Sequence, residues 1–179
     1  MHPDLDRWLQ GPAVGTRHRR ESSAAAEELW RAAATVTLRD CRLLGRLVGV
    51  RLPGARPEMT FDALFRAPPF LPLDEGPTWA LSGLCGRIWT VRGELGRLDH
   101  PQAFLDWREP GTVRVLFAHW AAPLERGAEL RSEVRIAPVD RRAAVYLRAL
   151  EPFIAAFQGL VGLETLSLAV RRAEQQATL

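Results

Sequence analysis

The stretch EPFIAAFQGLVGLE, residues 151–164, carries no charge between its two terminal glutamates. Around it, apolar residues recur at helical spacing and predict one long helix with an apolar stripe. The stripe consists of Leu147, Leu150, Ile154, Phe157, Val161 and Leu168. Pro152 predicts a kink or a new helix start near residue 151. Such a stripe needs an apolar surface to cover it, and we expect this helix to lie along a sheet.

Residues 112–119 and 129–137 supply that sheet, because polar and apolar residues alternate along both. In the second stretch Leu130, Ser132, Val134 and Ile136 share one face, and Glu129, Arg131, Glu133 and Arg135 share the other. In the first, Val113, Val115, Phe117 and His119 share a face opposite Thr112 and Arg114. This alternation predicts an antiparallel sheet with one covered face and one wet face.

Other β-rich runs, at residues 58–66 and 78–93, are bounded by Pro, Gly and Asp and predict further strands. Residues 97–111 read as a loop or a short helix between the middle strands. Before these runs we expect a loose lead-in over residues 1–15. A short strand over 16–22 and two short helices over 22–47, broken near 35–40, should follow it.

Composition limits the function. The chain of 179 residues predicts one domain, and its net charge of +3 is spread among acids rather than clustered as nucleic-acid binding requires. The N-terminus lacks the apolar core of a signal peptide, and no apolar run reaches the length of a spanning helix. Cys41 and Cys85 have no metal spacing and predict two buried, reduced thiols. We therefore expect a cytoplasmic protein without a metal or cofactor, and we leave open a homodimer.

Three short motifs carry a family resemblance. GLCGRIW at residues 83–89 looks like the glycine-glycine-aromatic strand of many bacterial START-like proteins, also called the SRPBCC or helix-grip superfamily. EPGTVRVLFAH with LRSEVRIAPVDRRA resembles their paired late strands, and YLRALEPFIAAF is similar to the helix that follows. The resemblance covers residues 16–175.

The resemblance implies an α+β helix-grip fold, in which residues 16–179 form a single START-like domain. A curved antiparallel sheet grips the long C-terminal helix across it and leaves a cavity between them. Members of the superfamily bind lipids, sterols, polyketides or other apolar molecules. Some are polyketide cyclases or aromatases, and others are assembly or co-chaperone factors. The fold by itself does not choose among these roles.

Two residues are candidates for chemistry. His119 ends a strand on the covered face, where an imidazole could act as an acid or base; the alternative is a hydrogen-bonded histidine at the rim of the core. Glu164 lies inside the apolar stripe and could meet a ligand. It could equally reach solvent or an arginine if Gly159 and Gly162 bend the helix.

Further residues are candidates for the cavity wall. Arg87 shares a face with Cys85 and Trp89 and is the arginine most expected to point inward, where it would suit an anionic head group. The favoured alternative is a snorkelling or ion-paired Arg87. Asp62 and Arg66 are either polar cavity groups or a salt-bridge set. Ser132 is expected to be structural, since the chain has no triad motif. The complete set of expected ligand-binding residues is Phe61, Phe65, Arg87, Trp89, Phe117, His119, Ser132, Tyr146, Phe157, Val161 and Glu164.

Three functions follow from this sequence. The first is a carrier, sensor or sequestering protein that binds a small hydrophobic or aromatic molecule between sheet and helix. The second is a cyclase- or aromatase-like enzyme in which His119 acts with Arg87 or Glu164, provided that at least two of them converge. The third is an interaction protein whose interior is filled by side chains.

Overall fold

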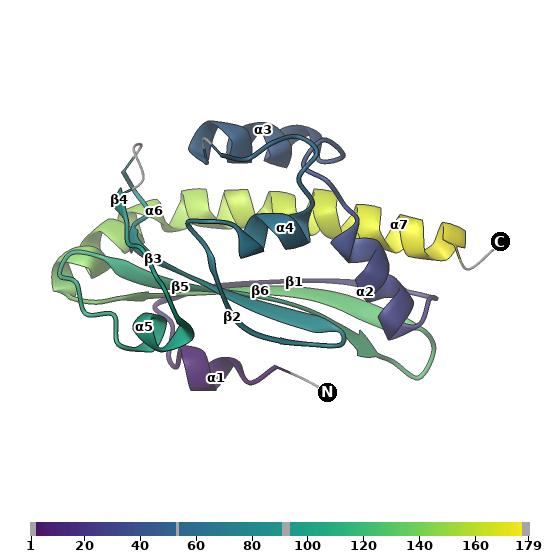
Figure 1. Cartoon of the computed structure of the whole chain (residues 1–179), viewed down its shortest axis with the longest axis horizontal. Coiled ribbons are helices and arrows are strands. Elements are labelled where there is room, and N and C mark those ends of the chain that lie inside the picture. The colour runs from purple at the N-terminus through teal and green to yellow at the C-terminus, as the bar shows by residue number, and fades with distance from the viewer. Residues whose placement is uncertain (1–2, 53, 91–93, 177–179) are drawn as a thin grey trace.

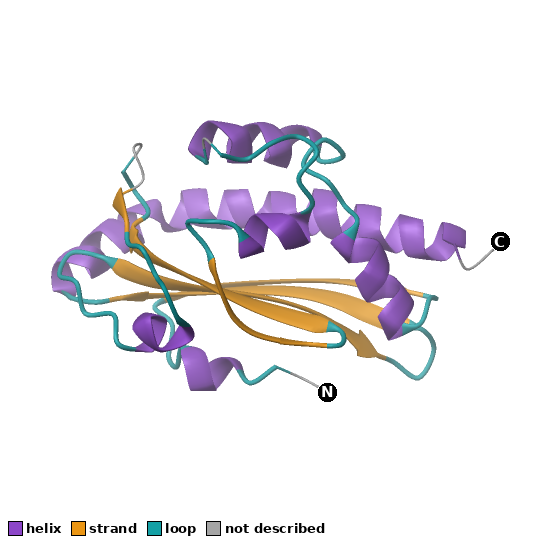
Figure 2. Ribbon diagram, viewed as in Figure 1, coloured by secondary structure: helices purple, strands orange, loops and turns teal. Residues whose placement is uncertain are grey.

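The computed structural model describes residues 3–52, 54–90 and 94–176. An antiparallel sheet forms the middle of the molecule, with a long C-terminal helix along one face and shorter helices on both sides (Figures 1 and 2). This is an α+β fold in which a long C-terminal helix lies across an antiparallel sheet, the arrangement that the resemblance implied.

The strands of the sheet are ordered β1-β6-β5-β3-β2, and every pair is antiparallel. They span β1 Val14–Ser22, β2 Leu71–Gly76, β3 Trp79–Arg87, β4 Glu94–Leu95, β5 Val113–Pro123 and β6 Ala128–Pro138. The short β4 pairs with the end of β3. Alternation along β5 and β6 predicted these two strands correctly, and the register places Phe117 opposite Val134 and His119 opposite Ser132 on one face.

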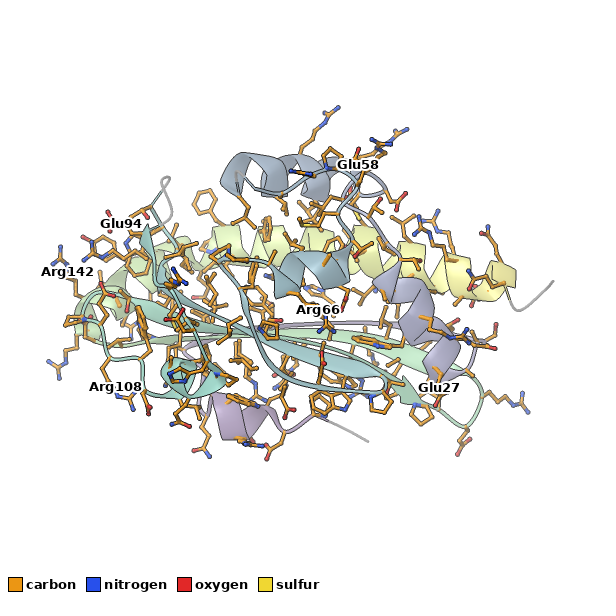
Figure 3. All side chains as sticks on the ribbon, viewed as in Figure 1. Glu27, Glu58, Arg66, Glu94, Arg108 and Arg142 are labelled. Atoms are coloured by element: carbon orange, nitrogen blue, oxygen red, sulfur yellow. The ribbon has the colours of Figure 1, made fainter. Side chains whose placement is uncertain are left out.

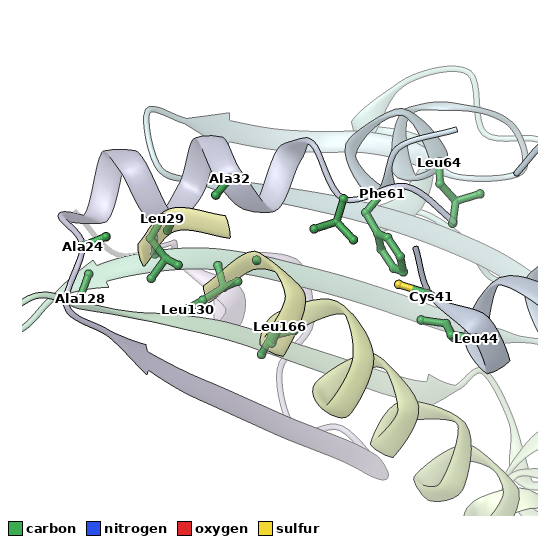
Figure 4. Close-up of a cluster of buried hydrophobic side chains, with 14 of the residues drawn as sticks. Ala24, Leu29, Ala32, Cys41, Leu44, Phe61, Leu64, Ala128, Leu130 and Leu166 are labelled. Carbon is green, nitrogen blue, oxygen red and sulfur yellow. The ribbon is translucent and has the colours of Figure 1, made fainter. Parts of the chain in front are cut away.

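We call the face that holds Phe117 and His119 the inner face. It is covered by α2 Ala26–Ala34, α4 Phe61–Arg66, α6 Arg141–Leu160, the π-helical segment η1 Val161–Thr165, and α7 Leu166–Gln176, with α3 Arg42–Arg51 beyond them. Leu29 of α2, Leu130 of β6 and Leu166 of α7 meet in one buried cluster (Figure 4). The predicted break between the two early helices is confirmed, because α2 ends at Ala34 and α3 begins at Arg42.

The outer face is not the wet face that we expected. The helices α1 Leu5–Trp8 and α5 Pro101–Leu105 cover part of it. Leu9 and Phe104 are buried there against apolar residues of β3 and β5. The segment expected to be a loose lead-in thus holds a packed helix, because Leu5, Trp8 and Leu9 are all buried.

Two glycines of the GLCGRIW motif have clear roles at this face. A Cβ at Gly83 would lie 2.6 Å from the Phe104 ring, so glycine lets α5 approach the sheet. Gly86 has a φ of 136°, and a Cβ there would lie 2.5 Å from the backbone oxygen of Glu94. Glycine at this position therefore allows β3 to turn and pair with β4.

The rest of the outer face carries the charged residues of β6. Glu133 accepts hydrogen bonds from Arg17 of β1 (2.9 Å) and from Arg135 (2.7 Å), and Arg131 pairs with Glu129. Both glutamates are buried beneath their arginine partners. These charged residues do face away from the inner layer, as the alternation predicted.

The C-terminal helix departs from expectation at two points. Its α-helical part continues through Pro152, and the irregular turn lies instead at Val161–Thr165. Pro152 is exposed, so water can reach the carbonyl that its missing N–H leaves unbonded. By length and composition the run Arg141–Gln176 could also cross a membrane, because one 18-residue window within it has a mean hydropathy of 1.7. A quarter of that apolar window is buried inside the structure, and the C-terminal part packs on α2 and the sheet.

One predicted strand is wrong. Residues 58–66 contain α4, which begins after Thr60, whose side chain accepts a hydrogen bond from the backbone N–H of Ala63. This helix cap outweighs the β-propensity of the aromatic residues around it. The strand β2, which contains two leucines and a proline, was not predicted.

Candidate functional site

A cavity of about 450 Å³ lies between the inner face of the sheet and the helices α3, α4 and α6. This volume lies in the range of small-molecule sites. Its floor comes from β3, β5 and β6, and its walls and roof come from the helices. We call it the main cavity; its apolar lining includes Leu44, Val48, Phe61, Phe65, Phe70, Leu84, Val115, Phe117, Val134, Ile136, Ile154 and Phe157.

Two lining residues show where the main cavity opens. Leu47 of α3 is 41% exposed and Phe153 of α6 is 72% exposed, although both also line the cavity. An opening edged by apolar side chains gives an apolar molecule a path from the surface to the floor.

Aromatic rings concentrate at the middle of the main cavity. The ring of Phe65 lies 5.2 Å from that of Phe117 and 4.8 Å from that of His119, and Phe70 packs edge-on against Phe117 at 5.4 Å. Tilted and edge-on pairs at these distances are mutually favourable. The cluster forms an aromatic part of the cavity lining.

His119 is the polar member of this cluster. Its side chain lines the cavity, yet its Nε2 atom has no solvent access and no hydrogen-bond partner among the described residues. Burial lowers the pKa of His119 to about 4, because the charged imidazolium would lose its hydration. The imidazole is therefore neutral at physiological pH. The alternative prediction, a histidine hydrogen-bonded at the rim of the core, therefore does not hold for the Nε2 atom of His119.

A smaller cavity of about 60 Å³, which we call the annex, adjoins the main cavity. Phe61, Phe65 and His119 line both spaces and so stand between them. Ser82 of β3 and Thr165 of η1 add hydroxyl groups to the annex lining, and both are buried. Sequence reasoning missed Ser82 because it assigned Cys85 and Arg87, of the opposite strand parity, to the covered face.

The expected cavity residues divide into two groups. Phe61, Phe65, Phe117, His119 and Phe157 line the main cavity together. Val161 lies outside the residues whose side chains are described.

Arg87, Trp89 and Tyr146 are placed differently. Arg87 pairs with Glu94 at 2.6 Å, and its side chain is 42% exposed. Arg87 thus takes the ion-paired alternative that was favoured, and it lines neither the main cavity nor the annex. Trp89 stacks on Tyr146 with ring centroids 5.2 Å apart, and neither lines the main cavity or the annex. Asp62 and Arg66 form the expected salt-bridge set, extended by Glu75.

Glu164 has a structural contact that the sequence did not indicate. Its two carboxylate oxygens accept hydrogen bonds from the backbone N–H groups of Leu43 (3.1 Å) and Leu44 (3.0 Å). These groups belong to the first turn of α3, and Cys41, the residue before that helix, provides no side-chain cap. Glu164 thus caps α3 from the C-terminal helix and fixes one wall of the main cavity.

Ser132 faces the inner layer as predicted and is buried, but it does not line either cavity. Cys41 and Cys85 are both free and buried, and burial raises the pKa of Cys85 to about 12. Neither thiol is therefore activated as a nucleophile. Across residues 3–52, 54–90 and 94–176 there is no group of three potential metal ligands.

Charged groups stay away from the main cavity. Figure 3 shows Glu27, Glu58, Arg108 and Arg142 at the periphery of the molecule. None of the described residues that line the main cavity is Asp, Glu or Arg, and its polar side chains are His119 and Gln158 alone. The site can therefore bind by apolar contact and a few neutral hydrogen bonds.

No protein-family model and no curated protein matches this chain. Among solved structures, TTHA0849 from Thermus thermophilus is 10% identical with a TM-score of 0.36, over 93% of this chain and 100% of that one. The di-domain ARO/CYC StfQ from the steffimycin biosynthetic pathway is 13% identical with a TM-score of 0.36, over 93% of this chain and 52% of that one. The Zhui aromatase/cyclase from Streptomyces sp. R1128 is 15% identical with a TM-score of 0.34, over 89% of this chain and 94% of that one. The chain spans about half the length of StfQ. Likeness at this level identifies no ligand or reaction.

Proposed function

We propose that this protein binds a small hydrophobic or aromatic molecule in the main cavity and acts as a carrier, a sensor or a sequestering protein. The observation that carries this proposal is an apolar space of about 450 Å³ with an apolar opening between α3 and α6. A cavity of this size costs packing energy, because its lining loses contacts that a filled core would make. Occupation by an apolar ligand would restore those contacts.

The two alternatives fit the geometry less well. An enzyme of the cyclase type would need His119 to meet Arg87 or Glu164, but Arg87 is paired with Glu94 and Glu164 caps α3. An interaction protein with a filled interior would leave no main cavity. Binding without catalysis needs the fewest groups beyond the side chains that line the main cavity.

Native mass spectrometry of the protein purified from its own host, with a denatured extract run alongside, tests the proposal. A titration with a naphthylamine dye, which fluoresces in apolar surroundings, adds a direct measure of binding. We expect a bound apolar molecule in the first experiment, and saturable one-to-one dye binding that the extracted molecule displaces in the second.

A matched pair of variants locates the binding. Ile154→Trp fills the main cavity from α6, whereas Val145→Trp adds the same side chain on the same helix at a position 66% exposed. Only the first should lose dye binding, by about tenfold or more. Equal dye binding by both variants, with both folded, would place the ligand elsewhere and refute the proposal.

A further inference from the structure

A row of polar side chains crosses the inner face of the sheet. The strand register places His119 of β5 directly opposite Ser132 of β6, and Ser132 directly opposite His18 of β1. Residues opposite each other on neighbouring strands project to the same side with their Cβ atoms about 5 Å apart. We call these three residues the polar row; it begins at the floor of the main cavity, where His119 lies.

The polar row is not satisfied by the protein. His119 Nε2, Ser132 Oγ and His18 Nε2 are all buried and have no hydrogen-bond partner among the described residues. Thr16 Oγ1, two residues before His18 on the same strand, is in the same state. Buried polar atoms in folded proteins nearly always have partners. His119 is the member of the row that lines the main cavity, so its unpartnered Nε2 points to a polar group supplied by the ligand.

The surroundings determine what kind of polar group that is. The described lining of the main cavity contains no charged residue. Two charged residues line the annex, but Asp62 is paired with Arg66 at 3.0 Å and Arg131 is paired with Glu129. A carboxylate or phosphate would lose its hydration here without meeting a free cation, which is strongly unfavourable.

The protonation state of His119 restricts the choice further. Burial keeps its imidazole neutral, so one ring nitrogen donates a hydrogen bond and the other accepts one. A hydroxyl group can likewise both donate and accept. In either tautomer it can pair with Nε2, the ring nitrogen that has no partner among the described residues.

We propose that the ligand of the main cavity is an uncharged molecule with an apolar, partly aromatic body and a hydroxyl group, and that His119 binds this hydroxyl at the end of the polar row. Gln158, which is buried and lines the same cavity from α6, is the second neutral polar group within reach of such a ligand. The inference rests on the proposed function, because it specifies the occupant of the same cavity.

Three probes with one skeleton test the inference: methylanthracene, hydroxymethylanthracene and anthracene carboxylate, titrated at pH 7.5 and followed by their own fluorescence. We expect hydroxymethylanthracene to bind about three- to tenfold more tightly than methylanthracene, the effect of one neutral hydrogen bond. The carboxylate should bind at least about a hundredfold more weakly than the alcohol, because its charge is desolvated without a partner.

Variants then assign the hydrogen bond. His119→Phe keeps a ring in the aromatic cluster but removes both nitrogens, and should abolish the preference for the alcohol while methylanthracene still binds. Gln158→Leu is the matched variant on the opposite wall and should keep the preference. If Gln158→Leu loses the preference and His119→Phe keeps it, the assignment to His119 is wrong.

The order of affinity of the three probes for the wild-type protein tests the class of ligand by itself. This test does not depend on the folding of any variant. Binding of methylanthracene as tightly as the alcohol, or tightest binding of the carboxylate, would overturn the inference and leave the proposed function standing. If none of the three probes bound, the proposed function would fail together with the inference.

Discussion

Replacing His119 by glutamine should remove a loss of stability that the wild-type protein suffers in mild acid. In the folded protein burial lowers the pKa of His119 to about 4, against 6.5 for an ordinary histidine. Below pH 6.5 the unfolded chain therefore takes up a proton that the folded protein resists. Stability is fully present above pH 6.5 and falls as the pH drops toward 4.

The magnitude follows from these two pKa values. Between pH 8 and pH 5 the linkage relation gives a loss of about 2 kcal/mol from His119 alone. The assay is urea unfolding followed by tryptophan fluorescence at both pH values, for the wild type and for His119→Gln. The carboxylates and the other histidines titrate in both proteins, so the difference between the two pH-dependences isolates His119.

His18→Gln is the control at the far end of the polar row. Burial and the nearby charge of Arg20 lower the pKa of His18 too, so this variant should show a change in the same direction. His119 should account for the larger part, because its Nε2 lies beneath the aromatic cluster. Equal losses of stability in the wild type and His119→Gln would refute the reasoning, since they would mean that His119 reaches solvent and protonates freely in the folded state.

Three substitutions test other features of the fold. Leu9→Ala should lower the free energy of unfolding by about 2–5 kcal/mol in urea titrations, because Leu9 is buried on the outer face; no effect would mean that the N-terminal segment is loose after all. Phe157→Ala should cost less than the ~3–5 kcal/mol of a fully buried phenylalanine, because Phe157 is half-buried beside the main cavity, and it should weaken dye binding. Glu164→Ala should cost about 1–2 kcal/mol and speed proteolysis within α3 by removing its cap; a protease pattern unchanged from wild type would argue against the capping role.

Local patterns predicted much of this fold. The alternation in residues 129–137 predicts β6 and its inner face, and the helical spacing around residues 147–168 predicts the long C-terminal helix. Both patterns involve residues only a few positions apart in the chain. They follow directly from the period with which side chains repeat along a strand or a helix. The same reasoning identified Phe117 and His119 as inward-facing, which the strand register confirms.

Where a pattern was weak, the prediction was wrong. Along residues 79–87 the chain is apolar on both sides, because both faces of the sheet are covered. Alternation then does not show which residues face inward, so Arg87 was a candidate for the cavity although its side chain pairs with Glu94. In residues 151–164 the absence of charge indicated burial, but Phe153 and Leu163 are exposed. The segment roofs a cavity, so only part of its apolar surface has a partner.

The sequence by itself thus determined the strands β5 and β6, the long helix and the apolar character of the interior, because period and polarity are properties of consecutive residues. Only the tertiary structure decided what the polar residues do. Glu164 meets Leu44 in the first turn of α3, 120 residues earlier in the chain. The polar row exists only because β1 and β5 pair with opposite edges of β6. Contacts at such separations depend on how the strands pair and the helices pack, which no local period encodes.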